Sequence, residues 1–198
     1  MLKCKGSDDH YAVKRIAQDM VNMGYSKFVF KSDQEPAILS LKEAVSRRVT
    51  AIKGDGVQII PEVSPVGESA SNGDVESAVK QVQGQFRTLR LYLQSKFNEV
   101  IPDDHKALAW LVPHSAHSLN RYLVGVDGRT PRQRLKGRNF KREVVDIGEC
   151  VWYLKPKSQG VDKMNTRWSE GVWLGVKEER GEMLIGTPEG VLKVRTIR

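Results

Sequence analysis

The chain has 198 residues, of which 39% are hydrophobic and 28% are charged, proportions that are ordinary for a folded globular protein. The sequence has no apolar run of membrane-spanning length and no signal-peptide core near its start. Two distant cysteines, Cys4 and Cys150, exclude a disulfide framework, and they form no zinc-binding spacing with the four histidines. We therefore expect an intracellular protein with no membrane partner.

The positive charge is concentrated in one part of the sequence. The chain as a whole has a net charge of +8, whereas residues 77–142 contain 13 Lys/Arg and four Asp/Glu, a net charge of +9. Such a local basic surface suits a phosphate backbone, and the alternative is a solvated helical face.

The first sixty residues alternate between helical and strand patterns. A helix is expected over 7–23, a strand over 27–30, a helix from Pro36 to about Arg48, and a strand within 56–63. Alternation of this kind predicts an α/β layer with parallel strands.

A Ser-, Pro- and Gly-rich stretch, 61–73, predicts a loop before a long helix. One side of that helix is apolar and includes Val75, Val79, Val82, Phe86, Leu89 and Leu93. The opposite side is polar and includes Glu76, Lys80, Gln83, Arg87 and Arg90. A further helix is expected over about 103–122, and a short basic helix follows Pro131.

From about residue 140, short aromatic and β-branched runs alternate with turn residues. This pattern predicts a small antiparallel β-barrel, with Trp152, Trp168 and Trp173 in its core. The change of pattern predicts two domains, residues 1–139 and 140–198.

Two carboxylates are candidates for chemistry. Asp33 follows a strand, and Glu76 begins a helix, so both could converge on Mg²⁺ or Mn²⁺ for phosphoryl transfer. The alternatives are that Asp33 caps the next helix and that Glu76 only complements the helix dipole. Asp74, Glu68 and Glu62 compete for the same role, although Asp74 points about 200° away from Glu76 around the helix.

The ordered motifs resemble those of retroelement integrases. "KSDQEPAI" and "SPVGESASNGDVESAV" are similar to the second and third acidic motifs of that family. "WLVPHSAHSLNRYLVGVDGRTPRQRLKGR" resembles the helix and Thr-Pro segment that follow the core in integrases of long-terminal-repeat retrotransposons. "RWSEGVWLGVKEERGEMLIGTPEGVLKVRTIR" looks like the SH3-like module after it, so the resemblance covers nearly the whole chain.

The resemblance implies a truncated RNase H-like α/β core followed by a small all-β SH3-like barrel. It implies that Asp33 and Glu76 are catalytic and hold Mg²⁺ or Mn²⁺, and that Asn72 and Gly73 position Glu76. It further implies DNA integration by end processing and strand transfer, within a retrotransposon polyprotein. The resemblance also implies that DNA contacts Lys80 and its face of the helix. The basic segment around residues 129–138 is a further candidate for DNA binding. The expected DNA-binding residues are Asn72, Lys80, Arg87, Arg90, Arg132, Arg134, Lys136 and Arg138.

The sequence departs from the family at its beginning. Nothing in "MLKCKG" matches the family's first catalytic aspartate, and Asp8 and Asp9 lie too close to Asp33 to replace it. We therefore expect an incomplete site that binds metal weakly and is inactive alone. We also expect an open sheet edge, with Val29 and the helix over 7–23 poorly covered.

Three functions remain open at this point. The first is an integrase-type polynucleotidyl transferase that acts in the nucleus, and the resemblance implies that it acts as a homo-oligomer. The second is a non-catalytic DNA- or chromatin-binding relic that uses the basic helix and the barrel. The third is an unrelated RNase H-like nuclease, which the C-terminal module argues against.

Overall fold

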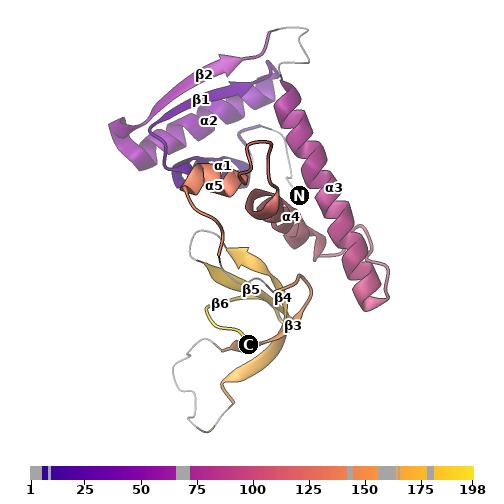
Figure 1. The fold of residues 1–198 in the computed structure, drawn as a ribbon. Coiled ribbons are helices and arrows are strands. Elements are labelled where there is room, and N and C mark those ends of the chain that lie inside the picture. The colour runs from indigo at the N-terminus through magenta and orange to yellow at the C-terminus, as the bar shows by residue number, and fades with distance from the viewer. Residues whose placement is uncertain are drawn as a thin grey trace. The chain divides into compact units, whose positions relative to one another are not determined.

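The computed structural model describes residues 6–8, 10–65, 72–141, 145–155, 164, 166–177 and 181–198 (Figure 1). Its contacts divide the chain into two compact units, Met1–Lys80 and Gln81–Arg198, which we call unit 1 and unit 2. This division falls inside a helix, and the domain boundary near residue 139 stays a prediction. Among the described residues, no helix is long and apolar enough to cross a membrane.

Unit 1 alternates helices and strands in the order expected. Its elements are α1 (His10–Met23), β1 (Lys27–Ser32), α2 (Pro36–Lys53), a 3₁₀ turn (Gly54–Gly56), β2 (Gln58–Val63) and the first turns of α3 (Gly73–Phe97). Strands β1 and β2 pair in parallel, with Val29 opposite Ile60. The predicted α/β layer with parallel pairing is therefore confirmed.

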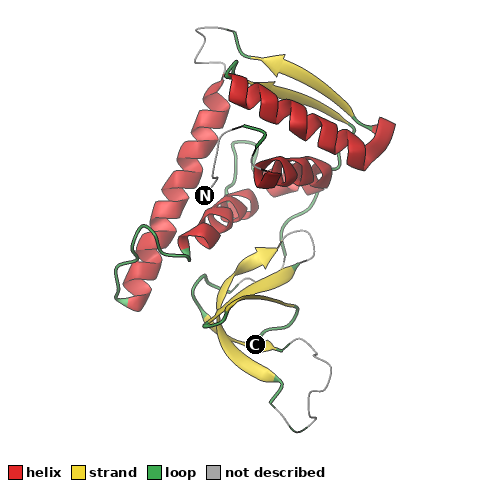
Figure 2. Cartoon of the chain, turned by 180° about the vertical axis from the view of Figure 1, so that it is seen from behind, coloured by secondary structure: helices red, strands yellow, loops and turns green. Residues whose placement is uncertain are grey.

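The core of unit 1 lies between its helices and one face of the sheet. Helix α1 contributes Val13, Ala17 and Met20, and α2 contributes Val45 and Val49. Alternate strand residues point to opposite faces, and the side chains that pack on this core are Phe28, Phe30 and Ile59. Both helices thus cover the same face of the sheet (Figures 1 and 2).

The other face of this sheet is open. Val29 is 59% exposed, and the neighbouring Lys31 and Glu62 form an ion pair at 3.6 Å. The expected exposure of Val29 is confirmed. The expectation for α1 is wrong, because Ala17 at the centre of that helix is fully buried against α2 and the sheet.

Unit 2 contains the rest of α3, then α4 (Leu108–Tyr122) and α5 (Pro131–Lys136). Helix α4 begins five residues later than the expected Asp103. Asp103 lies in the segment before the helix and forms an ion pair with Arg90 at 2.7 Å. Only the C-terminal part of the apolar side of α3 is covered: Leu93 is buried, whereas Val75 is 66% exposed.

The β-rich segment forms one antiparallel sheet in the order β3-β4-β5-β6. Its strands are β3 (Cys150–Leu154), β4 (Trp168–Lys177), β5 (Glu182–Thr187) and β6 (Gly190–Val194). The sheet is not a closed barrel, which corrects the prediction. Residues 196–198 lie antiparallel to the outer edge of β3, with one bridge from Tyr153 to Ile197. Trp152 and Arg198 exchange backbone hydrogen bonds of 3.0 and 2.8 Å, and the Leu154 N–H donates to the Thr196 carbonyl at 3.1 Å.

One core joins the sheet of unit 2 to its helices. Trp173 is 1% exposed and packs with Leu93, Leu111 and Ile185. In β3, Val151 and Tyr153 point inward, so Trp152 between them points outward and is 49% exposed. The expected burial is confirmed for Trp173 and wrong for Trp152. Trp168 is half-buried, and the Arg198 guanidinium lies 4.6 Å from its ring centre.

Candidate active site and nucleic-acid interface

Asp33 directly follows β1 and is exposed. The next helix, α2, is preceded by Glu35, which makes no side-chain cap, and Pro36 occupies its first turn. The alternative of Asp33 as the helix cap is therefore wrong, and its carboxylate remains at the carboxyl end of a parallel strand, where α/β sheets bind ligands.

Glu76 lies in the first turn of α3 and is exposed. The residue that precedes this helix, Asn72, accepts a hydrogen bond of 2.8 Å from the Ser64 hydroxyl to its side-chain oxygen Oδ1. Ser64 follows β2 and is only 4% exposed. The start of α3 is thus attached to the end of the sheet.

Ser64 also binds the segment that carries Asp33. Its backbone N–H donates to the Ser32 carbonyl at 2.8 Å, and its own carbonyl accepts from the Gln34 side chain at 3.1 Å. Ser64 therefore connects the end of β1, the end of β2 and the start of α3. We call these three residues, Gln34, Ser64 and Asn72, the strand-end link. Sequence reasoning missed Gln34 and Ser64, since a polar residue beside a turn carries no distinctive signal.

A buried lysine, Lys42, binds both strands near the edge of the sheet where Asp33 lies. Lys42 is 5% exposed, and its ammonium donates to the Ser32 hydroxyl at 3.3 Å and to the Glu62 carbonyl at 2.5 Å. Burial lowers the pKa of Lys42, and the nearby Glu62 charge opposes that shift. The sequence held a signal for this residue, because Lys42 shares the helical spacing of the core residues Val45 and Val49.

Asp33 and Glu76 are suitable ligands for a divalent cation, but two carboxylates are fewer than the three or more ligands of a metal cluster. Asp33 and Glu76 offer the hard oxygen ligands that Mg²⁺ and Mn²⁺ prefer, and both cations usually keep waters or substrate phosphates in their coordination. Within the described ranges, no cluster of three or more His, Cys, Asp or Glu could hold a metal. Among the competing acids, Glu62 pairs with Lys31, and Glu68 lies outside the described residues.

The predicted basic side of α3 divides into two groups. Lys80 and Arg87 are exposed. Arg90 donates to the Ile101 carbonyl and forms its ion pair with Asp103, so its charge holds the segment after α3 in place. The exposed pair is available to a phosphate backbone, whereas Arg90 already has a carboxylate partner.

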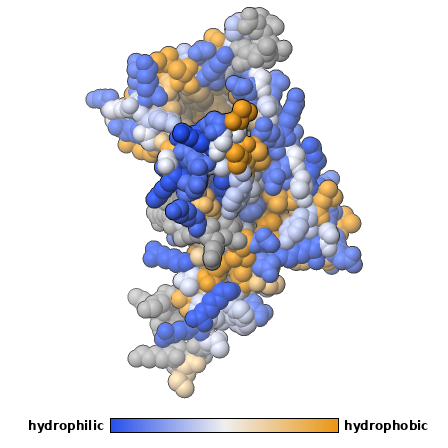
Figure 3. Space-filling model, in the orientation of Figure 1, coloured by the Kyte–Doolittle hydropathy of each residue, from blue (hydrophilic) through white to orange (hydrophobic). Residues whose placement is uncertain are grey.

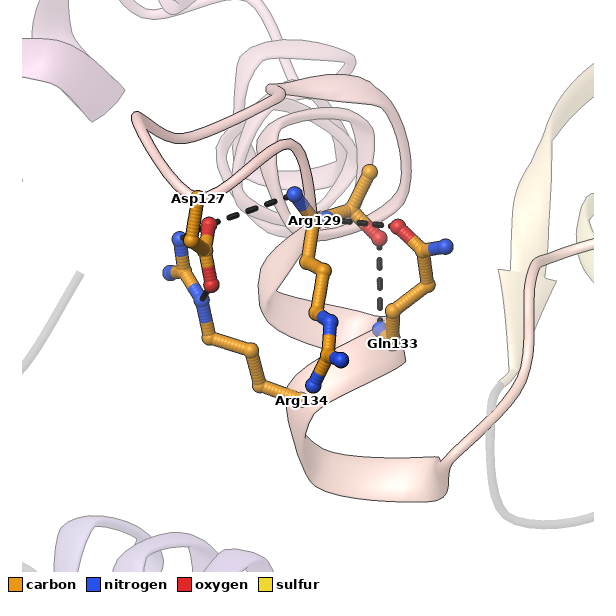
Figure 4. Close-up of polar contacts among 5 residues, drawn as sticks. Asp127, Arg129, Gln133 and Arg134 are labelled. Carbon is orange, nitrogen blue, oxygen red and sulfur yellow. Dashed lines mark hydrogen bonds and ion pairs between the residues drawn. The ribbon is translucent and has the colours of Figure 1, made fainter.

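The basic segment around α5 is braced by its own hydrogen bonds (Figure 4). Thr130 and Gln133 form a reciprocal capping box at the start of the helix. Arg134 donates to both carboxylate oxygens of Asp127, at 2.9 and 2.5 Å, and the Arg129 N–H donates to Asp127 at 3.2 Å. The Arg134 guanidinium accordingly holds the pKa of Asp127 far below its usual range. Arg134 is therefore a brace, while Lys136 and Arg138 are exposed.

No known family model matches the chain, and no curated protein gives a significant match. The integrase resemblance therefore stays a prediction from the motifs.

Proposed function

We propose that the chain is an incomplete integrase-type polynucleotidyl transferase from a retrotransposon polyprotein, which binds DNA in the nucleus and holds Mg²⁺ or Mn²⁺ weakly at a site with two carboxylates. The observation that supports this most is the strand-end link. Through Gln34, Ser64 and Asn72 it attaches the segment after β1, which carries Asp33, to the start of α3, which carries Glu76.

In this proposal each residue has a separate task. Asp33 and Glu76 hold the cation, which when bound activates the attacking oxygen and stabilises the leaving oxygen of a phosphodiester. The strand-end link keeps the first turn of α3 in place, and the exposed Lys80 and Arg87 bind the DNA backbone along the same helix. A site with two carboxylates binds its cation weakly, so Mn²⁺ is the more sensitive probe.

The test is nuclease and strand-transfer activity on end-labelled duplex DNA with Mn²⁺. The incomplete site is expected to give at most weak wild-type activity. Glu76→Gln is expected to lower any measurable activity at least about 100-fold, since even the supporting partners of metal ligands contribute about 10- to 100-fold. Glu43→Gln is the matched control, because Glu43 is an exposed acid on α2. Equal and measurable activity of both variants would exclude Glu76 as a metal ligand.

A second candidate is a non-catalytic DNA-binding protein. The exposed Lys80, Arg87, Lys136 and Arg138 support it, because they bind phosphate without any metal. This function predicts salt-sensitive DNA binding that Glu76→Gln leaves unchanged, together with no Mn²⁺-dependent product from the wild-type chain.

A further inference from the structure

A basic pocket in unit 2 lies outside the carboxylate site. It has a volume of about 500 Å³, and its lining includes Arg121, Arg132, Arg138, Asn139, Phe140 and Lys141. This volume falls within the range of about 300–1,000 Å³ that is usual for small-ligand pockets. No Asp or Glu occurs among the lining residues that the structure describes.

One aromatic ring, that of Phe140, lies in the pocket lining. The guanidinium carbons of Arg121 and Arg132 lie 4.4 and 5.0 Å from the ring centre of Phe140. Tyr122 meets the same ring edge-on at 6.3 Å. Arg121 is only 5% exposed, so its charge acts within a largely dehydrated wall, where electrostatic attraction is stronger than in water.

Two charged side chains of the pocket lining are exposed to solvent. Arg138 and Lys141 are exposed, and they flank Phe140 in the chain. Gly137, which ends α5 in the left-handed conformation with φ 69°, turns the chain into this segment. The capping box and the Asp127–Arg134 pair brace the residues before it.

We propose that this pocket binds one unpaired nucleotide of a DNA strand, a role that rests on the proposed nucleic-acid function. Arg138 and Lys141 bind its phosphate, since guanidinium and ammonium groups are the usual phosphate partners. The partly exposed Arg132 guanidinium, which lies over the Phe140 ring, offers a stacking surface for its base. A concave site of this size admits an unstacked base, whereas a base within a duplex is not accessible to it.

The test measures binding of the full chain to a labelled 12-nucleotide single strand and to a blunt duplex by fluorescence anisotropy. The pocket variant is the double substitution Arg138→Gln with Lys141→Gln. Its matched control is Lys193→Gln with Arg195→Gln, which removes the same charge from exposed positions on and just after β6.

The pocket variant is expected to lose about tenfold in single-strand affinity, against a two- to threefold loss in the control. Its slope of log affinity against log salt should fall by about 0.7, because the two side chains bind one phosphate and each phosphate contact of a single strand contributes about 0.7. Equal losses in the two variants, or an equal loss on the duplex, would overturn the proposal.

Two further measurements separate the parts of the proposal. Phe140→Leu should weaken binding of the single strand more than binding of the duplex, with an unchanged circular dichroism spectrum. Equal effects on the two DNAs would mean that the pocket does not bind the base.

Thymidine monophosphate should displace the single strand at lower concentration than inorganic phosphate does. Equal potency would mean that the pocket binds only an anion, and would overturn the nucleotide assignment.

These results are distinguishable from failure of the proposed function. A wild-type chain that binds neither DNA overturns both proposals. A selective loss in the pocket variant, with no Mn²⁺-dependent activity in the wild type, supports the pocket and overturns only the catalytic role.

Discussion

Both units are built from helices and strands, but they differ in the side chains that fill their cores. Unit 1 has a two-stranded parallel sheet with helices on one face, and the side chains that it buries completely are small: Ala17, Val45 and Val49. Unit 2 packs helices on a four-stranded sheet around Trp173 and Leu111. Because burial of apolar area is the main stabilising term, unit 2 is expected to be the more stable of the two.

The largest expected effect is the removal of the central side chain of unit 2. Trp173→Ala should lower the free energy of unfolding by about 3–5 kcal/mol, whereas Val45→Ala in unit 1 should cost about 2 kcal/mol. Urea unfolding followed by far-ultraviolet circular dichroism measures both. A cost for Val45→Ala that equals or exceeds that of Trp173→Ala would break the comparison.

A glycine tests how tightly the core of unit 2 is closed. Gly148 has φ 78°, and a Cβ there would lie 2.6 Å from Leu93 Cδ2. We expect Gly148→Ala to cost about 2–4 kcal/mol, from backbone strain and overpacking together. Gly128 has φ 73° and open space around it, so Gly128→Ala measures the strain alone, about 1–2 kcal/mol. Thermal unfolding measures the loss of stability in both variants. If the two losses are equal, the Leu93 side chain moves aside without cost.

The acid sensitivity of unit 2 should depend on His114, whose ring meets that of Trp173 edge-on at 5.5 Å. Burial, then the charges of Arg121 and His117, lower its pKa from 6.5 to about 4. Below about pH 6.5 the unfolded chain therefore binds the proton more readily than the folded chain, and stability falls as the pH decreases toward 4.

The loss is expected to be on the order of 1–2 kcal/mol, after allowance for the partial exposure of the ring. Urea unfolding between pH 7 and 4 measures it, and His114→Phe should flatten the dependence while keeping an aromatic ring against Trp173. If His114→Phe loses as much stability between pH 7 and 4 as the wild type does, another group causes the acid sensitivity.

The smallest effect concerns one ion pair in each unit. Lys96 and Glu149 meet at 2.6 Å and join α3 to the residue before β3, whereas Lys31 and Glu62 lie 3.6 Å apart across exposed strand positions. Double-mutant cycles should give about 0.5–1 kcal/mol for the first pair and nearly zero for the second. The first coupling should shrink at 1 M salt. A larger coupling in unit 1 would reverse the expected order.

The sequence by itself determined most of the secondary structure, because residue spacing and turn chemistry are local. Apolar residues at helical spacing predicted α1, α2 and α3, and Pro131 predicted the start of α5. The helix–strand alternation also predicted the parallel pairing of β1 and β2. Asp33 and Glu76 were identified as candidates from sequence, and both lie in unit 1 at the positions expected, after a strand and at a helix start.

The tertiary structure decided which of several equivalent side chains are buried or paired. Nothing local distinguishes Trp152 from Trp173, yet strand alternation against one core exposes the first and buries the second. Arg90 and Arg134 look like Arg87 in sequence, but each has a carboxylate partner brought close only by folding. The strand-end link and the pocket at Phe140 likewise join residues from separate elements, and contacts of that kind depend on the packing of the whole unit rather than on local spacing.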